Sequence, residues 1–175
     1  MKSLSTASVD ASDVKQLISF TVGEEEFGLE LQRVKEVIRM CQITWLPRAP
    51  YYMKGVISLR GEVIPIINLR ERLGLPAIRQ TSSTRIIVVE LKGRKVGIVV
   101  DSASQVVRLP GEQIDPAPQA MSKVAEELIS GIGKLDERLI VLLDIDSVVT
   151  SEELVRISDS LKDAAGESSG GVDLS

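Results

Sequence analysis

Short apolar runs separated by polar turns follow one another along most of the chain. Residues 17–22 and 27–31 flank the turn GEEE, and residues 85–91 and 96–100 flank the turn KGRK. Runs of this length with a period of two are typical of β-strands, and a Gly-containing turn between two of them predicts a hairpin. We therefore predict a β-hairpin at each of these places.

The pattern of the first half recurs in the second. Two pairs of segments align, residues 17–40 with 86–109 and residues 55–69 with 131–145. Gly28 falls on Gly97 and Val37 on Val106, and nearly every apolar residue meets another apolar residue. The chain therefore holds two copies of one unit. A feature that both copies share indicates the fold, whereas a feature of one copy alone indicates function.

Each copy is predicted to hold about five short strands. After the first hairpin, Val34, Val37 and Ile38 have helical spacing, which predicts one helical turn leading into a strand. A second strand pair follows in each copy, with turns at Arg60-Gly61 and Asp136-Glu137. Short strands with regular turns predict a small barrel or sandwich, and units this small bury little surface alone. We therefore expect a mainly β fold in which two small units pack across an apolar interface.

The ends of the chain differ from its centre in composition. Residues 1–14 are small and polar and residues 163–175 are rich in Gly and Ser, which predicts a disordered tail at each end. The segment SEELVRISDSLKDA has apolar residues at helical spacing and predicts a C-terminal helix at 151–162, capped by Thr150 or Ser151. The predicted domain covers 15–155, with subdomains at about 15–82 and 83–150.

The overall composition excludes several classes of protein. A hydrophobic fraction of 43% is enough for a real core, and a net charge of −4 argues against nucleic-acid binding. No apolar run reaches the ~18–20 residues that span a bilayer, and the N-terminus lacks the apolar stretch of a signal peptide. Cys41 is the single cysteine, so no intramolecular disulfide can form, and we expect a cytoplasmic protein.

Histidine is absent from the sequence. This removes the commonest general base and metal ligand, so a Ser-His-Asp site, a Cys-His site and the usual Cys/His zinc site are all impossible. We therefore expect no catalytic residue, no metal and no cofactor.

Two motifs with potential chemistry are better explained by the repeat. SGIGK at 130–134 lacks the full phosphate-loop pattern and aligns with KGVIS at 54–58, which predicts a strand. Asp144 and Asp146 form a pair of acids, but their counterparts in the first copy are Asn and Arg, and no third oxygen ligand with a known spacing lies nearby. We expect these acids to end a strand and lead into a helix.

Two further features have plain structural interpretations. The acidic run Glu24–Glu26 is expected to be a solvated hairpin turn. Trp45, the only tryptophan, is expected to be partly buried, either as a core residue or as an interface anchor.

Arg60 is the strongest functional candidate. It lies at a turn where the second copy has Asp-Glu, so the fold does not require arginine there. Its planar, permanently charged guanidinium suits carboxylates of a partner. Val34 and Glu36 also differ from their counterparts, Ala103 and Gln105. Val34 is either an exposed apolar contact of a protein–protein site or simply part of the core.

Three stretches carry a resemblance to a known family: GVISLRGEVIPIINLRERLG at 55–74, VGIVVDSASQVVRL at 96–109 and LISGIGKLDERLIVLLDID at 128–146. They resemble CheW, the coupling protein of bacterial chemotaxis, and the resemblance runs from about residue 16 to 155. It implies two five-stranded, SH3-like β-barrel subdomains without catalytic activity. The family bridges the cytoplasmic tip of chemoreceptors to the histidine kinase CheA, whose regulatory domain is itself CheW-like.

The resemblance also implies contact residues. The receptor-contacting positions fall on Val34, Glu36, Val37, Gly55, Arg60 and Gly61, and Ile86 is expected to line the same groove between subdomains. The kinase-contacting surface is expected to include Ile18 and Leu31. The receptor hairpin would dock as a helix in a groove.

Two alternatives remain open at this point. One is a CheW paralogue in a non-chemotactic array, such as one that controls twitching motility. The other is a small enzyme that uses Asp101, Asp144 and Asp146, which would have to converge in one cleft.

Overall fold

The computed structural model describes residues 13–117, 127–150, 152–159 and 161, and it is mainly β. The strands are β1 (Val14–Val22), β2 (Glu25–Glu30), β3 (Val34–Arg39), β4 (Met53–Leu59), β5 (Glu62–Asn68), β6 (Arg85–Leu91), β7 (Arg94–Val100), β8 (Ser102–Pro110), β9 (Ile114–Asp115), β10 (Ile129–Leu135) and β11 (Arg138–Leu143). The short helices are η1 (Leu31–Arg33), α2 (Leu69–Arg72), η2 (Gly111–Gln113) and α4 (Ile145–Val148). The predicted tail at 1–14 ends within this part, since β1 begins at Val14, and the rest of it and the tail at 163–175 lie outside the described residues.

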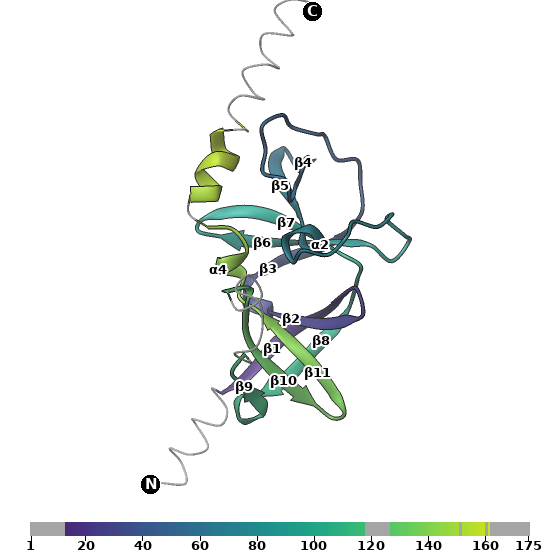
Figure 1. The fold of residues 1–175 in the computed structure, drawn as a ribbon, viewed down its shortest axis with the longest axis vertical. Coiled ribbons are helices and arrows are strands. Elements are labelled where there is room, and N and C mark those ends of the chain that lie inside the picture. The colour runs from purple at the N-terminus through teal and green to yellow at the C-terminus, as the bar shows by residue number, and fades with distance from the viewer. Residues whose placement is uncertain (1–12, 118–126, 151, 160, 162–175) are drawn as a thin grey trace, which may run out of the picture.

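The strands form two sheets, which occupy the lower and upper halves of the molecule (Figure 1). One sheet has the order β8-β1-β2-β11-β10-β9, and the other has the order β3-β6-β7-β5-β4. The sequence repeat makes β1 equivalent to β6, β2 to β7, β3 to β8, β4 to β10 and β5 to β11. Each sheet therefore takes the first hairpin of one copy and the remaining strands of the other, so the two copies are intertwined.

This exchange differs from the predicted contiguous subdomains 15–82 and 83–150. The hairpins themselves form as predicted, but β2 pairs in parallel with β11 and β7 pairs in parallel with β5. A repeat reveals which segments are equivalent, but it does not reveal which copy provides the partner of a strand. The boundary near residue 82 therefore does not separate the two sheets.

The glycines matched by the repeat lie at these parallel contacts. Gly28 is opposite Leu142, and Gly97 is opposite Ile66. A Cβ atom at Gly97 would lie 2.6 Å from Cδ1 of Ile66, and one at Gly28 would lie 2.9 Å from Cγ2 of Ile140. Both copies need glycine because the strand from the other copy packs so closely there.

The apolar core has three parts. Each sheet curls around a small interior cluster, Leu17, Val107, Leu109, Ile140 and Leu142 in one and Ile57, Ile64, Ile66, Ile86 and Val88 in the other. The largest cluster lies between the sheets and includes Phe20, Phe27, Ile87 and Ile98. This shared core confirms the prediction that the two units pack across an apolar interface.

The predicted helical turn at Val34, Val37 and Ile38 is wrong in its position. The turn is η1, which ends at Arg33, and the three residues belong to strand β3. A β-bulge interrupts the pairing of β3 with β6 between Val34 and Glu36. The extra residue lets Val34 and Val37 lie on one face of the sheet although they are three positions apart, which produces a helix-like spacing on a strand.

The C-terminal helix spans 152–159 among the described residues and packs on the core between the sheets. Of the two predicted caps, Thr150 caps the helix, and Ser151 lies outside the described residues. The Thr150 Oγ1 atom accepts from the N–H of Glu153 at 3.1 Å, and the Glu153 carboxylate accepts from the N–H of Thr150 at 2.8 Å. This is a capping box, and Leu154 and Ile157 are buried beneath it.

Two side chains differ from their sequence-based expectations. Trp45 is 73% exposed rather than partly buried, and its neighbour Leu46 is buried in its place. Glu26 is not in a solvated turn. It lies on β2, where its carboxylate accepts from Ser19 and from Arg138.

Candidate functional site

The structure brings Arg60 and Glu36 together across the two edges of the five-stranded sheet. Arg60 is in the β4–β5 turn with a φ of 51°, and Glu36 is on β3. The guanidinium donates to both carboxylate oxygens of Glu36, one of them at 2.9 Å from Nη2. This hydrogen bonding lowers the pKa of Glu36 and raises the pKa of Arg60. One side of the Arg60 guanidinium is therefore already bound by a carboxylate of the same chain.

Arg60 still presents a cationic surface to solvent, since 71% of its side chain is exposed against 26% for Glu36. Glu36 fixes the orientation of the guanidinium, and the remaining N–H groups point away from the carboxylate. An arginine held in this way loses less conformational freedom when it binds a partner than a free one does. The pair is thus a preorganised polar element at the edge of the sheet.

Three valines lie near this pair on the edge strands β3 and β8. They are Val34, Val37 and Val106, and we call them the apolar margin. Val34 and Val37 are opposite Val89 and Ile87, two members of the core between the sheets. Directly paired residues lie on the same face of a sheet, so both valines face the side where the two sheets meet. Val34 is half-buried and packs against that core, and Val37 is 36% exposed.

Val106 is the matching valine on the edge strand of the other sheet. It is the repeat counterpart of Val37, is 51% exposed and lies opposite Ile18 on β1. Ile18 packs against the core between the sheets, so Val106 also lies on the inward face. Sequence reasoning did not include Val106 in the site, although its alignment with Val37 was a usable signal.

Gly55 and Gly61 have structural roles beside the site. Gly55 is buried, has a φ of 143°, and a Cβ atom there would lie 2.1 Å from the carbonyl oxygen of Thr44. This close approach allows the Thr44–Val56 bridge next to β4. Gly61 is exposed, with a φ of 83° that completes the turn started by Arg60. A change at Gly55 would therefore displace the site indirectly.

The expectation that Ile86 lines a groove differs from its place in the structure. Ile86 is fully buried in the interior cluster of the five-stranded sheet, with Ile57 and Val88. Its neighbour Ile87 faces the core between the sheets instead. The alternation of a strand places the two on opposite faces, and the resemblance alone could not tell which one pointed to the interior.

The two residues expected to contact the kinase occupy different surroundings. Ile18 lies within reach of the apolar margin, opposite Val106. Leu31 begins η1 and lines a shallow hollow with the start of β1. Because Ile18 pairs with Leu29 and Leu17 pairs with Glu30, Leu31 lies one position further along the β1–β2 pairing, two residues from the partner of Ile18.

The acids considered for catalysis do not converge. Asp101 is bound by Arg70, whereas Asp146 is bound by Arg33, and the two carboxylates line different cavities. Asp144 caps α4 by accepting from the N–H of Asp146, as expected for a strand end that leads into a helix. Among the described residues, no group of three His, Cys, Asp or Glu side chains could hold a metal ion.

Comparison with known proteins gives a consistent result. Residues 16–153 match the family model described as a CheW-like domain. The chain belongs to the CheW-like family. It is 37% identical to the chemotaxis protein CheW of Klebsiella aerogenes over 93% of this chain and 99% of that protein. It is also 37% identical to the chemotaxis protein CheW of Rhizobium meliloti, over 79% of this chain and 90% of the relative.

A solved structure shares the fold. The scaffolding protein TtCheW of Thermoanaerobacter tengcongensis superposes with a TM-score of 0.73 at 31% identity, over 79% of this chain and 94% of the other. The CheW-like fold of two packed β subdomains, expected from the resemblance, is therefore confirmed. No helix in the described part of this CheW-family chain is long and apolar enough to cross a membrane.

Proposed function

We propose that this chain is a non-enzymatic adaptor that couples chemoreceptors to the histidine kinase CheA in bacterial chemotaxis. The observation that carries the proposal is the similarity to proteins named chemotaxis protein CheW along nearly the full length of both chains. The likeness to a structure described as a scaffolding protein supports binding rather than catalysis. The names of the relatives favour a chemotactic array over one for twitching motility, and a cytoplasmic location accords with this role.

The receptor-binding face is the apolar margin together with the Arg60–Glu36 pair. Val34, Val37 and Val106 offer a partly exposed apolar strip where the two sheets meet. A helical hairpin tip would lay its apolar side on this strip, and Arg60 would bind polar groups beside it. Apolar contact provides affinity in such sites, and the charged rim provides orientation.

The kinase-binding face includes Leu31, which lies outside the apolar margin. Ile18 stays a candidate kinase contact, but its place opposite Val106 means that a substitution there would also disturb the receptor-binding face. Leu31 therefore offers the cleaner test of the two. In an adaptor, a substitution on one face should weaken binding of one partner without weakening binding of the other.

The test is a calorimetric titration with the regulatory domain of a CheA-type kinase, followed by a kinase assay with receptor-containing membranes. Wild type is compared with Arg60→Glu and with Arg94→Glu. Arg94→Glu is the control, because Arg94 is an exposed arginine at the start of β7 in the same sheet. We expect all three to bind the kinase domain and only Arg60→Glu to lose receptor-dependent activation. Absence of kinase binding by wild type would contradict the proposal.

A further inference from the structure

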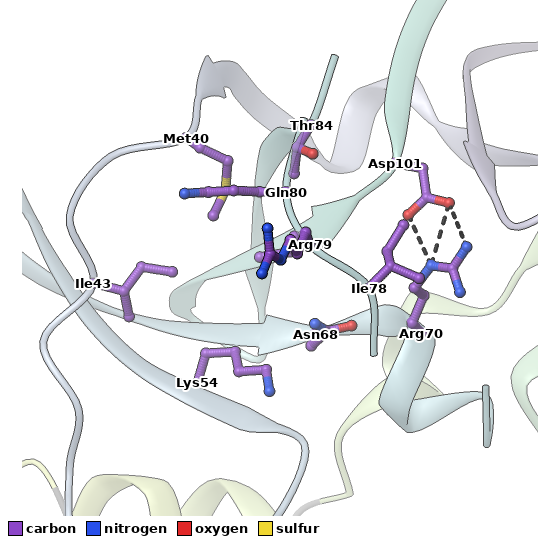
Figure 2. A pocket seen from close by; sticks show the side chains of 11 residues that line it. Met40, Ile43, Lys54, Asn68, Arg70, Ile78, Arg79, Gln80, Thr84 and Asp101 are labelled. Atoms are coloured by element: carbon purple, nitrogen blue, oxygen red, sulfur yellow. Dashed lines mark hydrogen bonds and ion pairs between the residues drawn. The ribbon is translucent and has the colours of Figure 1, made fainter. Parts of the chain in front are cut away.

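A cavity of about 320 Å³ lies on the five-stranded sheet, away from the apolar margin. It is enclosed by the end of β5, the start of α2, the loop that joins α2 to β6, and the segment that follows β3 (Figure 2). Its size falls in the range of sites for small molecules. Its walls are apolar at Met40, Ile43, Ile78 and Val99.

The polar groups of the cavity are mostly donors. Three cations, Lys54, Arg70 and Arg79, line the cavity together with a single carboxylate, that of Asp101. Asp101 is already bound by Arg70 and by the N–H of Gly23. Lys54 is paired with Glu71. Within the described residues Arg79 has no hydrogen bond or ion pair, so it is the cation in excess, and Figure 2 draws it between Lys54 and Gln80.

Two neutral side chains add donors to this arrangement. The Asn68 Oδ1 atom accepts from the N–H of Glu71, which leaves its amide NH₂ group available to donate. The Thr84 Oγ1 atom accepts from the N–H of Thr81, which leaves its hydroxyl proton available. Arg79 and Ile78 are exposed at the open side of this cavity, whose lining is partly apolar. Unused donors and one excess cation beside apolar side chains are the complement of an anion with an apolar body.

The second copy shows that this charge is not a consequence of the fold. A cavity of about 290 Å³ lies at the equivalent place on the other sheet. There Ser130, Asp144 and Asp146 stand where the first cavity has Lys54, Asn68 and Arg70. The hollow recurs because the topology recurs, but cations outnumber carboxylates in the first cavity, whereas carboxylates outnumber cations in the second, which also contains Lys15 and Arg33.

We propose that the cavity around Arg79 binds a small organic anion, a carboxylate or phosphate group on a short apolar body. The anionic group would lie against Arg79, Asn68 and Thr84, and the apolar body would lie against Ile43 and Ile78. The ligand would join the α2–β6 loop to the segment that follows β3.

The experiment is a titration of the full chain followed by the backbone amide signals in a two-dimensional ¹H–¹⁵N NMR spectrum. The probes are benzoate and phenyl phosphate, with benzamide as the neutral analogue of benzoate. We expect saturable shifts at residues 78–80 and Lys54, with affinities on the order of 1 mM for probes of this size. The stronger of the two anions identifies the preferred group.

Two variants decide whether the cavity is the site. Arg79→Gln should weaken the binding of the anions about tenfold, since a charge-assisted hydrogen bond is lost. Arg108→Gln, which removes an exposed arginine of β8 outside the cavity, should leave it unchanged. Equal shifts with benzamide, no saturation with either anion, or unchanged affinity in Arg79→Gln would each overturn the proposal.

Discussion

Arg70 donates from Nε and Nη2 to the two carboxylate oxygens of Asp101, at 3.0 and 2.9 Å. At the equivalent place in the other half, Arg33 donates to both oxygens of Asp146, at 2.6 and 3.1 Å. Arg70 and Asp146 are counterparts in the repeat, and Asp101 aligns with Gln32, the neighbour of Arg33, so both copies have an ion pair here with its charges reversed. Each pair lies where the chain crosses from one sheet to the other.

The pH dependence of stability should report the first of these pairs. Burial opposes ionisation of Asp101, but hydrogen bonds from Arg70 and from the N–H of Gly23 outweigh it and hold its pKa below the ordinary value. A pKa lowered on folding adds stability above the unfolded-state pKa, about 3.9, and that stability is lost as the pH falls through the folded-state pKa. Asp101→Asn should cost about 1–3 kcal/mol at neutral pH and much less in acid, below the folded-state pKa of Asp101.

Urea denaturation at the two pH values measures this difference. Asp136→Asn, at an exposed turn residue with a φ of 56°, is the matched control, because asparagine tolerates that conformation. An equal loss of stability at both pH values would show that the charge of Asp101 does not stabilise the segment where the chain passes from one sheet to the other.

The Arg60–Glu36 pair can be separated into a structural and a binding role by exchanging its charges. Arg60→Glu alone places two carboxylates side by side, and the double variant Arg60→Glu with Glu36→Arg restores an ion pair in the opposite direction. We expect both proteins to fold, since an acid stands at the equivalent turn of the second copy. We expect neither to recover receptor-dependent kinase activation.

Recovery in the double variant would mean that only the ion pair matters, and Arg60 would then have no direct contact with the receptor. Thermal denaturation of the single and double variants provides the necessary check on folding. The kinase assay with receptor-containing membranes provides the functional measurement.

The apolar margin should tolerate charge in the free protein but not in the complex. Val37→Asp and Val106→Asp alter side chains that are already partly exposed, so their effect on the free energy of unfolding should stay small. Each should lower receptor affinity by about tenfold or more, because a carboxylate would be desolvated against an apolar helix face. Co-sedimentation with receptor-containing membranes measures the loss.

Val155→Asp is the control for these two variants, since Val155 is an exposed valine on the C-terminal helix. If all three variants bind receptor equally well, the binding face lies elsewhere on the molecule.

The intertwined topology predicts how the two halves of the chain behave when they are separated. The fragment that ends at residue 82 contains β2 without β11, and the fragment that begins at residue 83 contains β7 without β5. Neither could complete a sheet, so each alone should lack the dispersed amide signals of a folded protein. Mixed or co-expressed, they should assemble, and circular dichroism and NMR would detect this. An independently folded fragment would contradict the exchange of strands.

The local elements could be predicted from the sequence because their signals are local. The Lys92-Gly93 and Arg60-Gly61 turns need positive φ values, and the structure has them. The pairing of β2 with β11 could not be predicted, since Gly28 reveals a close approach but not the identity of the strand that approaches. The prediction of a helical turn at Val34 and Val37 was wrong because a β-bulge also places residues three positions apart on one face.

The same limit applies to the site. Arg60 and Glu36 were each identified from differences between the copies, yet their ion pair depends on two sheet edges meeting in space. Ile86 was expected in the groove but is buried in the interior cluster of its sheet. Neighbouring residues of β6 point into different clusters, so an error of one residue places the side chain on the wrong face. Val106 could not be found from differences between the copies, because both copies have valine at this position.

The exchange of strands also sets the order of events during synthesis on the ribosome. The β1–β2 hairpin is made first, but its parallel partner β11 is the last strand in the described chain. Until residues 138–143 leave the exit tunnel, the open edge of β2 stays available to other chains. The strands of the five-stranded sheet are all made by Val100, whereas the six-stranded sheet, which holds the first hairpin, must wait for β11.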